Sequence, residues 1–142
     1  MPEPIAVLYT ARATAYGEGR NGHVTSDDDV LDVDLAVPAS MGGPGGDLSN
    51  PEQLFAAGYA ACFHSALKLV ALRAKAGTEG STVTAEVGIG PQGRGFGLTV
   101  ALEVSLPSLE REQAEHLVAE AHEVCPYSNA TRGNIEVSLR VS

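Results

Sequence analysis

The stretch SNPEQLFAAGYAACFHSALKLVALRAKAG occupies residues 49–77, and it sets the fold around one long helix. The Ser-Asn pair that opens it is typical of helix caps, and Pro51 suits the first helical position because it has no N–H group to leave unpaired. Glu52 is favoured at the positive end of the helix dipole. The pattern predicts a helix from Pro51 to about Ala76, ended by Gly77.

Alternating apolar and polar residues predict strands on both sides of this helix. The clearest alternation places every second residue from Leu98 to Leu106 on one face. A second helix is expected from about Ser108 to Cys125, because Pro126 cannot easily continue it. Further strands are expected at 5–15, 23–26, 31–37 and 81–89, and in the last residues, where Ile135, Val137, Leu139 and Val141 share a face.

The resulting order of elements is βββ-α-ββ-α-β. It predicts an α+β fold in which antiparallel sheets, built mainly from local hairpins, pack around two helices. The 142 residues are enough for one domain and show no linker or internal repeat, so a single domain over 1–142 is expected. The run Gly88–Gly93 matches a dinucleotide-binding fingerprint, but a strand follows it where that motif needs a helix. We interpret it as a hairpin turn.

Composition excludes several classes of partner. The net charge is −9 and no basic cluster is present, so there is no electrostatic footprint for nucleic acid or for anionic membranes. We expect no apolar run to approach the roughly 20 residues of a membrane span. The N-terminus lacks the basic start and apolar stretch of a signal peptide, which predicts a cytoplasmic protein.

The chain has two cysteines, Cys62 on the first predicted helix and Cys125 at the end of the second. Each one alone can be a small buried packing residue. Two cysteines on helices that must pack together can instead form a redox pair, if their Cα atoms come within about 4.4–6.8 Å. In a reducing compartment a permanent structural bridge is not expected.

A zinc site is the alternative use of these sulfurs. Cys62, His64, His122 and Cys125 offer two sulfur and two nitrogen ligands, which is a plausible tetrahedral set. However, Cys62 and His64 are two residues apart on a helix and point about 200° apart around its axis, so the two side chains cannot easily hold one ion.

Motifs along nearly the whole chain resemble the organic hydroperoxide resistance (Ohr) family of the OsmC-like superfamily. The longest surround the cysteines. The matching stretches are Leu8-Tyr9-Thr10-Ala11, Gly19-Arg20-Asn21-Gly22, Leu31-Asp32-Val33, Gly42-Gly43-Pro44-Gly45-Gly46, Asn50-Pro51-Glu52-Gln53-Leu54-Phe55-Ala56-Ala57-Gly58-Tyr59, Ala61-Cys62-Phe63 and His122-Glu123-Val124-Cys125-Pro126-Tyr127-Ser128-Asn129-Ala130-Thr131-Arg132-Gly133-Asn134.

This resemblance implies an intertwined homodimer and a thiol peroxidase that reduces organic hydroperoxides, both alkyl and lipid, without metal, haem or flavin. It implies that Cys62 attacks the peroxide and Cys125 resolves the product, while Arg20 and Glu52 activate the first thiol. It also implies an external dithiol reductant of the lipoyl type, such as dihydrolipoamide on a lipoylated protein. On their own, Arg20 is an ordinary turn arginine and Glu52 an ordinary first-turn carboxylate.

The chemistry sets a demand on Cys62. A thiolate is the nucleophile, and a free thiol titrates near ~8.5. Burial is expected to raise that pKa, and a position in the middle of a helix is expected to deny Cys62 the help of a helix N-terminus. A cation is therefore needed, and Arg20 is the candidate. The sequence departs from the family pattern at Glu18, which adds a carboxylate beside Arg20, and at His64, which replaces an apolar residue.

A hypothesis from another class is a non-enzymatic module that binds small apolar ligands beside the Ala- and Gly-rich helix. It needs neither thiol. The reaction of the two thiols with an organic peroxide distinguishes it from the enzyme.

Overall fold

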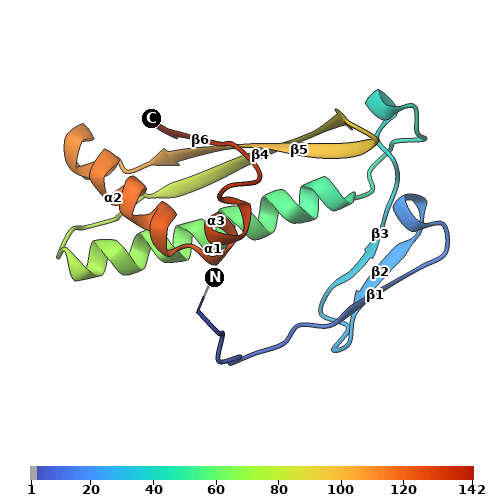
Figure 1. Ribbon diagram of the computed structural model, residues 1–142, viewed down its shortest axis with the longest axis horizontal. Coiled ribbons are helices and arrows are strands. Elements are labelled where there is room, and N and C mark those ends of the chain that lie inside the picture. The colour runs from blue at the N-terminus through green and yellow to red at the C-terminus, as the bar shows by residue number, and fades with distance from the viewer. Residues whose placement is uncertain (1–2) are drawn as a thin grey trace. The chain divides into compact units, whose positions relative to one another are not determined.

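The computed structural model describes residues 3–142. The chain divides into two compact units, one ending at Pro51 and the other running from Glu52 to Ser142, and each is described by itself. Within the units, the elements follow the predicted order, with one additional short helix before the last strand (Figure 1).

The N-terminal unit is a three-stranded antiparallel meander of β1 (Ala13–Tyr16), β2 (His23–Ser26) and β3 (Asp32–Asp34). Two 3-10 helices, Gly19–Asn21 and Ala39–Met41, lie in its loops. The expected strand at 5–15 is much shorter than predicted, because within residues 3–142 no strand pairs with the apolar run before Ala13. Its large side chains are exposed, namely Ile5, Val7, Leu8 and Tyr9.

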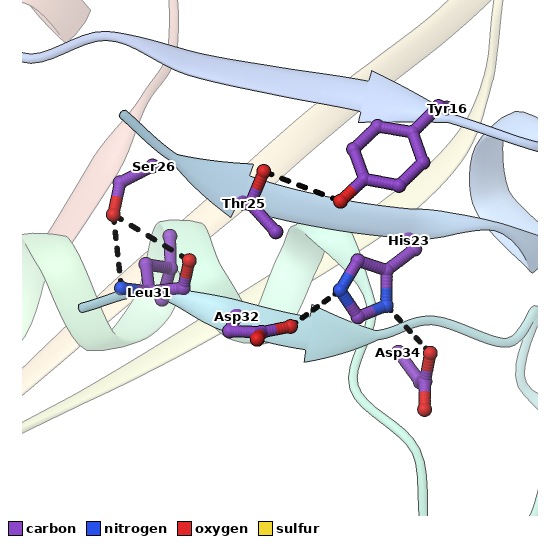
Figure 2. A network of polar contacts seen from close by, with 7 residues as sticks. All are labelled: Tyr16, His23, Thr25, Ser26, Leu31, Asp32 and Asp34. Carbon is purple, nitrogen blue, oxygen red and sulfur yellow. Dashed lines mark hydrogen bonds and ion pairs between the residues drawn. The ribbon is translucent and has the colours of Figure 1, made fainter. Parts of the chain in front are cut away.

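An ionic contact joins β2 to β3 on this meander. Both ring nitrogens of His23 meet carboxylates: Nδ1 lies 2.6 Å from Asp34 and Nε2 lies 2.5 Å from Asp32 (Figure 2). The pKa of His23 is raised above its usual 6.5, chiefly by the hydrogen bond to Asp34, against a smaller opposing effect of burial. Beside this contact, the Tyr16 hydroxyl donates to Thr25 across β1 and β2 at 3.3 Å.

The C-terminal unit holds a sheet in the order β4-β5-β6, with helices along one face (Figure 1). Its elements are α1 (Pro51–Arg73), β4 (Thr82–Gln92), β5 (Gly95–Ser105), α2 (Arg111–Val124), α3 (Pro126–Thr131) and β6 (Val137–Val141). The register of β4 against β5 runs to the pair Gln92–Gly95, so the Gly88–Gly93 run lies in a hairpin and not before a helix. The turn itself is shorter than predicted, because Gly88 to Gln92 belong to β4 and only Gly93 and Arg94 connect the strands.

The expectation of purely antiparallel sheets is wrong for β6, which pairs with β5 in parallel. The reason is the connection between them. A tight turn reverses the chain and gives an antiparallel neighbour, whereas a crossover through helices returns it in the same direction. Here α2 and α3 form that crossover.

One core lies between the helices and the inner face of this sheet. The predicted alternation is confirmed on β5, where Val100, Leu102 and Val104 are buried and the intervening residues face away. The other fully buried side chains come mostly from two helices and include Tyr59, Phe63, Leu67, Val70, Ala71, Ala114, Leu117, Val118 and Ala121.

The end of α1 differs from the prediction, because the helix stops at Arg73 and the chain turns before Gly77. Lys75 takes a left-handed backbone conformation, with φ of 58°. The N–H of Ala76 donates to the carbonyl of Ala71, which closes the helix in the manner of a Schellman motif. A lysine thus fills the position that a glycine usually takes.

By length and composition, α1 is apolar enough to cross a membrane, contrary to the expectation that no such segment exists. Three of its large side chains, Tyr59, Phe63 and Leu67, are completely buried within the core. The apolar character of α1 therefore has a use inside the folded unit, as the central helix that packs on the sheet.

Candidate functional site

The two cysteines meet in the C-terminal unit. Their Sγ atoms are 3.7 Å apart, although the residues are 63 positions apart in sequence. Cys125 is completely buried and Cys62 is partly buried, and both are free thiols. A disulfide needs about 2.05 Å between the sulfurs, so a small movement closes the pair.

Cys125 lies at the corner between α2 and α3, and Pro126 creates that corner. The residue before a proline is driven out of the helical region, and Cys125 has φ −61° and ψ 124°. Its N–H donates to Ala121 and so ends α2, while its carbonyl accepts from Asn129 and so begins α3. The prediction that Pro126 stops the second helix is therefore confirmed, and the same proline starts the third.

The first turn of α3 contributes a hydrogen bond to the site. The backbone N–H of Tyr127 donates to the sulfur of Cys62, which favours the thiolate. The expectation that no helix N-terminus can assist Cys62 is wrong in this respect. Cys62 is in the middle of its own helix, but α3 brings a backbone donor to it from elsewhere in the chain.

The surroundings of Cys62 within this unit still disfavour the thiolate overall. Burial is the largest influence and raises the pKa of Cys62, and the neighbouring Cys125 raises it further. The N–H of Tyr127 offsets only part of this effect. The demand for additional positive charge, expected from the sequence, therefore holds.

An aromatic cluster lines the same part of the unit. The rings of Phe55, Tyr59 and Tyr127 contact one another, with centroids 5.6 to 6.2 Å apart. Gly58 permits this approach, since a Cβ atom there would lie 2.8 Å from the Tyr127 hydroxyl oxygen. Motif reasoning included these residues in the resemblance but gave them no role.

A chain of polar side chains lies behind the cysteines. The Tyr59 hydroxyl is 2.8 Å from the Ser128 hydroxyl and 3.2 Å from that of Thr131. Ser128 is in turn 2.8 Å from Nδ1 of His122. Burial and the Arg132 guanidinium lower the pKa of His122, so this imidazole is neutral at neutral pH.

The ligand set considered for zinc is not assembled. Nε2 of His64 lies 2.9 Å from Ser81, whereas His122 contacts Ser128. Among residues 3–142, no group of three or more histidine, cysteine, aspartate or glutamate side chains is arranged to hold a metal ion.

The two remaining predicted site residues belong to different units. Arg20 lies in the 3-10 helix Gly19–Asn21 of the N-terminal unit, which Glu18 precedes. Glu52 lies in the first turn of α1, as predicted from the capping pattern. Glu52 is ten residues before Cys62. Because α1 is continuous between them, the two residues are about 15 Å apart along the helix axis. Their roles stay predictions.

Comparison with known proteins adds an independent line of evidence. A family model described as OsmC-like protein matches residues 44–140. The organic hydroperoxide resistance protein of Xanthomonas axonopodis pv. citri is 51% identical over 143 positions, covering 100% of both chains. The Bacillus subtilis protein OhrB is 49% identical, covering 94% of this chain and 98% of its own.

Solved structures agree. A crystal structure of an organic hydroperoxide resistance protein from Elizabethkingia anophelis superposes with a TM-score of 0.92 at 56% identity. The superposition covers 97% of this chain and 99% of that one.

Proposed function

This chain belongs to the OsmC-like protein family and has its α+β fold, and from that premise we propose that it is a cysteine peroxidase which reduces organic hydroperoxides to alcohols. The relatives carry the name organic hydroperoxide resistance protein, which supports a role in resistance to organic hydroperoxides. The observation that carries the finer proposal is the 3.7 Å separation of the two thiol sulfurs.

The first step takes place at Cys62, the more exposed of the two thiols. Its thiolate attacks one peroxide oxygen, so that an S–O bond forms and the O–O bond breaks. The departing alkoxide takes a proton and leaves as the alcohol. Cys62 is then a sulfenic acid.

The second step uses Cys125, which is already beside it. The Cys125 sulfur attacks the Cys62 sulfur, so that an S–S bond forms and the S–O bond breaks. The hydroxide takes the Cys125 proton and leaves as water. The disulfide protects Cys62 from further oxidation to the sulfinic acid.

An external dithiol completes the cycle. Two successive exchanges transfer the disulfide to the reductant and restore both protein thiols. We assign this role to a lipoyl-type dithiol, such as dihydrolipoamide on a lipoylated protein, as the family resemblance implies. No metal or organic cofactor takes part in this scheme.

Arg20 supplies the positive charge that the thiolate needs, and Glu52 holds the guanidinium. Lowering the pKa of an ordinary thiol from ~8.5 to ~7 requires about 2 kcal/mol of differential stabilisation. Burial raises the pKa of Cys62 above its ordinary value and adds to this demand, toward which an arginine in a partly buried site contributes. A carboxylate and a guanidinium form two parallel hydrogen bonds, and such a pair has a fixed orientation. Arg20 can also donate to the peroxide oxygens as charge develops on the leaving group.

The apolar surroundings suit an alkyl or lipid hydroperoxide. Phe55 and Tyr127 offer aromatic surface in the part of the unit that holds Cys62, and each Å² of alkyl surface buried there contributes about 25 cal/mol. Hydrogen peroxide has no alkyl group, so it gains no binding free energy from this apolar surface.

We further propose that the active form is a cytoplasmic homodimer. The apolar run at the start of the chain is exposed in the single chain, where Leu8 is 99% and Ile5 is 85% exposed. This exposure supports the proposal, because a second subunit would cover the run. Contiguous apolar surface of this kind is uncommon on a monomer.

A thiol titration tests the proposed function. Reduced protein is mixed with one equivalent of cumene hydroperoxide per chain, and free thiols are counted at short times. Rapid loss of two thiols per chain, with one equivalent of alcohol formed, supports the enzyme. Thiols that stay inert toward the peroxide refute it and favour the module that binds apolar ligands.

A further inference from the structure

The polar chain behind the cysteines has a definite direction, which follows from how many protons its members carry. Thr131 donates its hydroxyl proton to the carbonyl of Ser128 at 3.1 Å, because a carbonyl can only accept. Thr131 must therefore accept from Tyr59. Tyr59 has then used its only proton, and Ser128 must donate to it.

The same reasoning fixes the tautomer of His122. Ser128 has used its hydroxyl proton on Tyr59, so its contact with His122 requires Nδ1 to carry a hydrogen. All four contacts form together in this arrangement alone: His122 donates to Ser128, Ser128 to Tyr59, Tyr59 to Thr131, and Thr131 to the Ser128 carbonyl. Ordered polar chains of this kind, largely buried and with every contact formed, favour one local packing.

The chain joins the three elements that carry the reacting sulfurs. Tyr59 is on α1, one turn before Cys62, while Ser128 is on α3, one turn after Cys125. His122 is on the last turn of α2, three residues before Cys125. Tyr59 and Ser128 are completely buried, so a hydroxyl that loses its partner there has no water to replace it.

We propose that Tyr59, with Ser128 and His122 behind it, is a positioning residue which holds the Cys125 corner against α1 so that the two sulfurs lie within reach of a disulfide bond. Tyr59 acts through the backbone that carries the cysteines and is not a catalytic residue. The step it supports is the one already balanced above, in which an S–S bond forms, the S–O bond of the sulfenic acid breaks and water leaves. The importance of this step for turnover rests on the proposed function, whereas the positioning itself does not.

The test measures how readily the two thiols pair without any peroxide. Purified protein is equilibrated in glutathione redox buffers, quenched with acid, and analysed for the Cys62–Cys125 disulfide, which gives the effective concentration of one thiol toward the other. Tyr59→Phe and His122→Leu should each lower it about tenfold, the loss expected for a broken buried hydrogen bond. For a two-electron couple, tenfold corresponds to about 30 mV in reduction potential.

Two further variants separate positioning from general damage. In His122→Asn the amide nitrogen is as many bonds from Cα as Nδ1 of histidine, so the donor to Ser128 is kept, and the wild-type value should be retained. His116→Leu removes an exposed histidine from the same helix, and it should also retain the wild-type effective concentration. Circular dichroism and thermal melts establish that each variant is folded, and His122→Leu still decides the matter if Tyr59→Phe does not fold.

The outcomes are distinct. A wild-type effective concentration in folded Tyr59→Phe, or equal losses in His122→Asn and His122→Leu, would overturn the positioning role. The same proteins are then mixed with one equivalent of cumene hydroperoxide. If the wild-type thiols do not react, the proposed function is wrong, yet the glutathione equilibria still decide the positioning role.

Discussion

The Sγ atom of Cys125 lies 3.7 Å from that of Cys62, at a corner that Pro126 forces between α2 and α3. Of the two, Cys125 is completely buried, whereas Cys62 is partly exposed. A peroxide that approaches from solvent would therefore meet Cys62 first, and this asymmetry supports the different roles proposed for the two thiols.

The different roles proposed for the two cysteines predict different outcomes when each one is replaced by serine. Cys62→Ser should abolish peroxidase turnover, because no nucleophile remains at the exposed position. Cys125→Ser should still consume one equivalent of hydroperoxide and then form a sulfinic acid at Cys62 when peroxide is in excess. Intact-protein mass spectrometry measures both products. If Cys62→Ser keeps turnover and Cys125→Ser loses the first reaction, the roles are reversed.

Arg20 should shift the pH dependence of Cys62. Burial and Cys125 raise the pKa of this thiol, and the proposed role of Arg20 is to lower it. Since the thiolate is the reactive form and exists above the pKa, Arg20→Ala should move the rise of the alkylation rate to higher pH. At pH 7 the rate of Cys62 alkylation should fall about tenfold.

Arg12→Ala is the matched control, since it removes an exposed arginine from the same unit. Its alkylation profile should coincide with that of the wild type. If the wild type and Arg20→Ala had the same pH dependence of alkylation, Arg20 would have no part in activating the thiol.

Glu52 is expected to serve the Cys62 of the partner subunit. On the continuous α1 the two residues of one chain are about 15 Å apart along the axis, far beyond the roughly 3 Å of a hydrogen bond. A group that bridges Arg20 and Cys62 is therefore hard to build within one chain. Mixing inactive Cys62→Ser subunits with inactive Glu52→Ala subunits should restore activity, because one of the two sites in the mixed dimer is intact.

Differently tagged subunits allow the mixed dimer to be purified and assayed alone. A mixed dimer as inactive as its parents would show that Glu52 serves its own chain. Mixing Cys62→Ser with Cys125→Ser subunits is the matched control, because both cysteines of a site come from one chain and no intact site forms.

Substrate choice should reflect the aromatic surface near Cys62. A fatty-acid or cumene hydroperoxide should have a kcat/KM at least about tenfold above that of hydrogen peroxide, because its alkyl group is buried in the transition state. Phe55→Ala should narrow this ratio by lowering the value for the organic substrate only. Equal kcat/KM values for both peroxides in the wild type would show that no apolar pocket contributes.

The contact of His23 with Asp32 and Asp34 should make the N-terminal unit sensitive to pH. The pKa of His23 is raised in the folded state, so its stabilising contribution is complete below the unfolded value near 6.5 and is lost as pH rises through the folded pKa. An NMR titration of the His23 ring should give a midpoint above 6.5. Asp34→Asn should lower that midpoint, since the Asp34 hydrogen bond is the largest cause.

Asp27→Asn removes the same charge from an exposed position of this unit and is the control. The midpoint of His23 should move much less in it. A midpoint in the wild type at or below 6.5 would contradict the ionic contact.

Much of the fold could be predicted because it rests on short-range signals. The start of α1 follows from residues that are adjacent in sequence, and the inner face of β5 follows from strict alternation. Both depend on local backbone preferences and on burial of one face, which a window of a few residues contains. The end of α1 was harder, since Lys75 adopts a conformation usual for glycine.

The sequence by itself determined the class of fold and the family, and it identified the two cysteines as the candidate reactive pair. Tertiary structure alone decided that their sulfurs meet, that the Tyr127 N–H reaches Cys62, and that β6 runs parallel to β5. These contacts join residues tens of positions apart, and their distances are set by how whole helices pack on the sheet. Local preferences carry no information about such distances, because packing selects among many arrangements that satisfy the same pattern equally well.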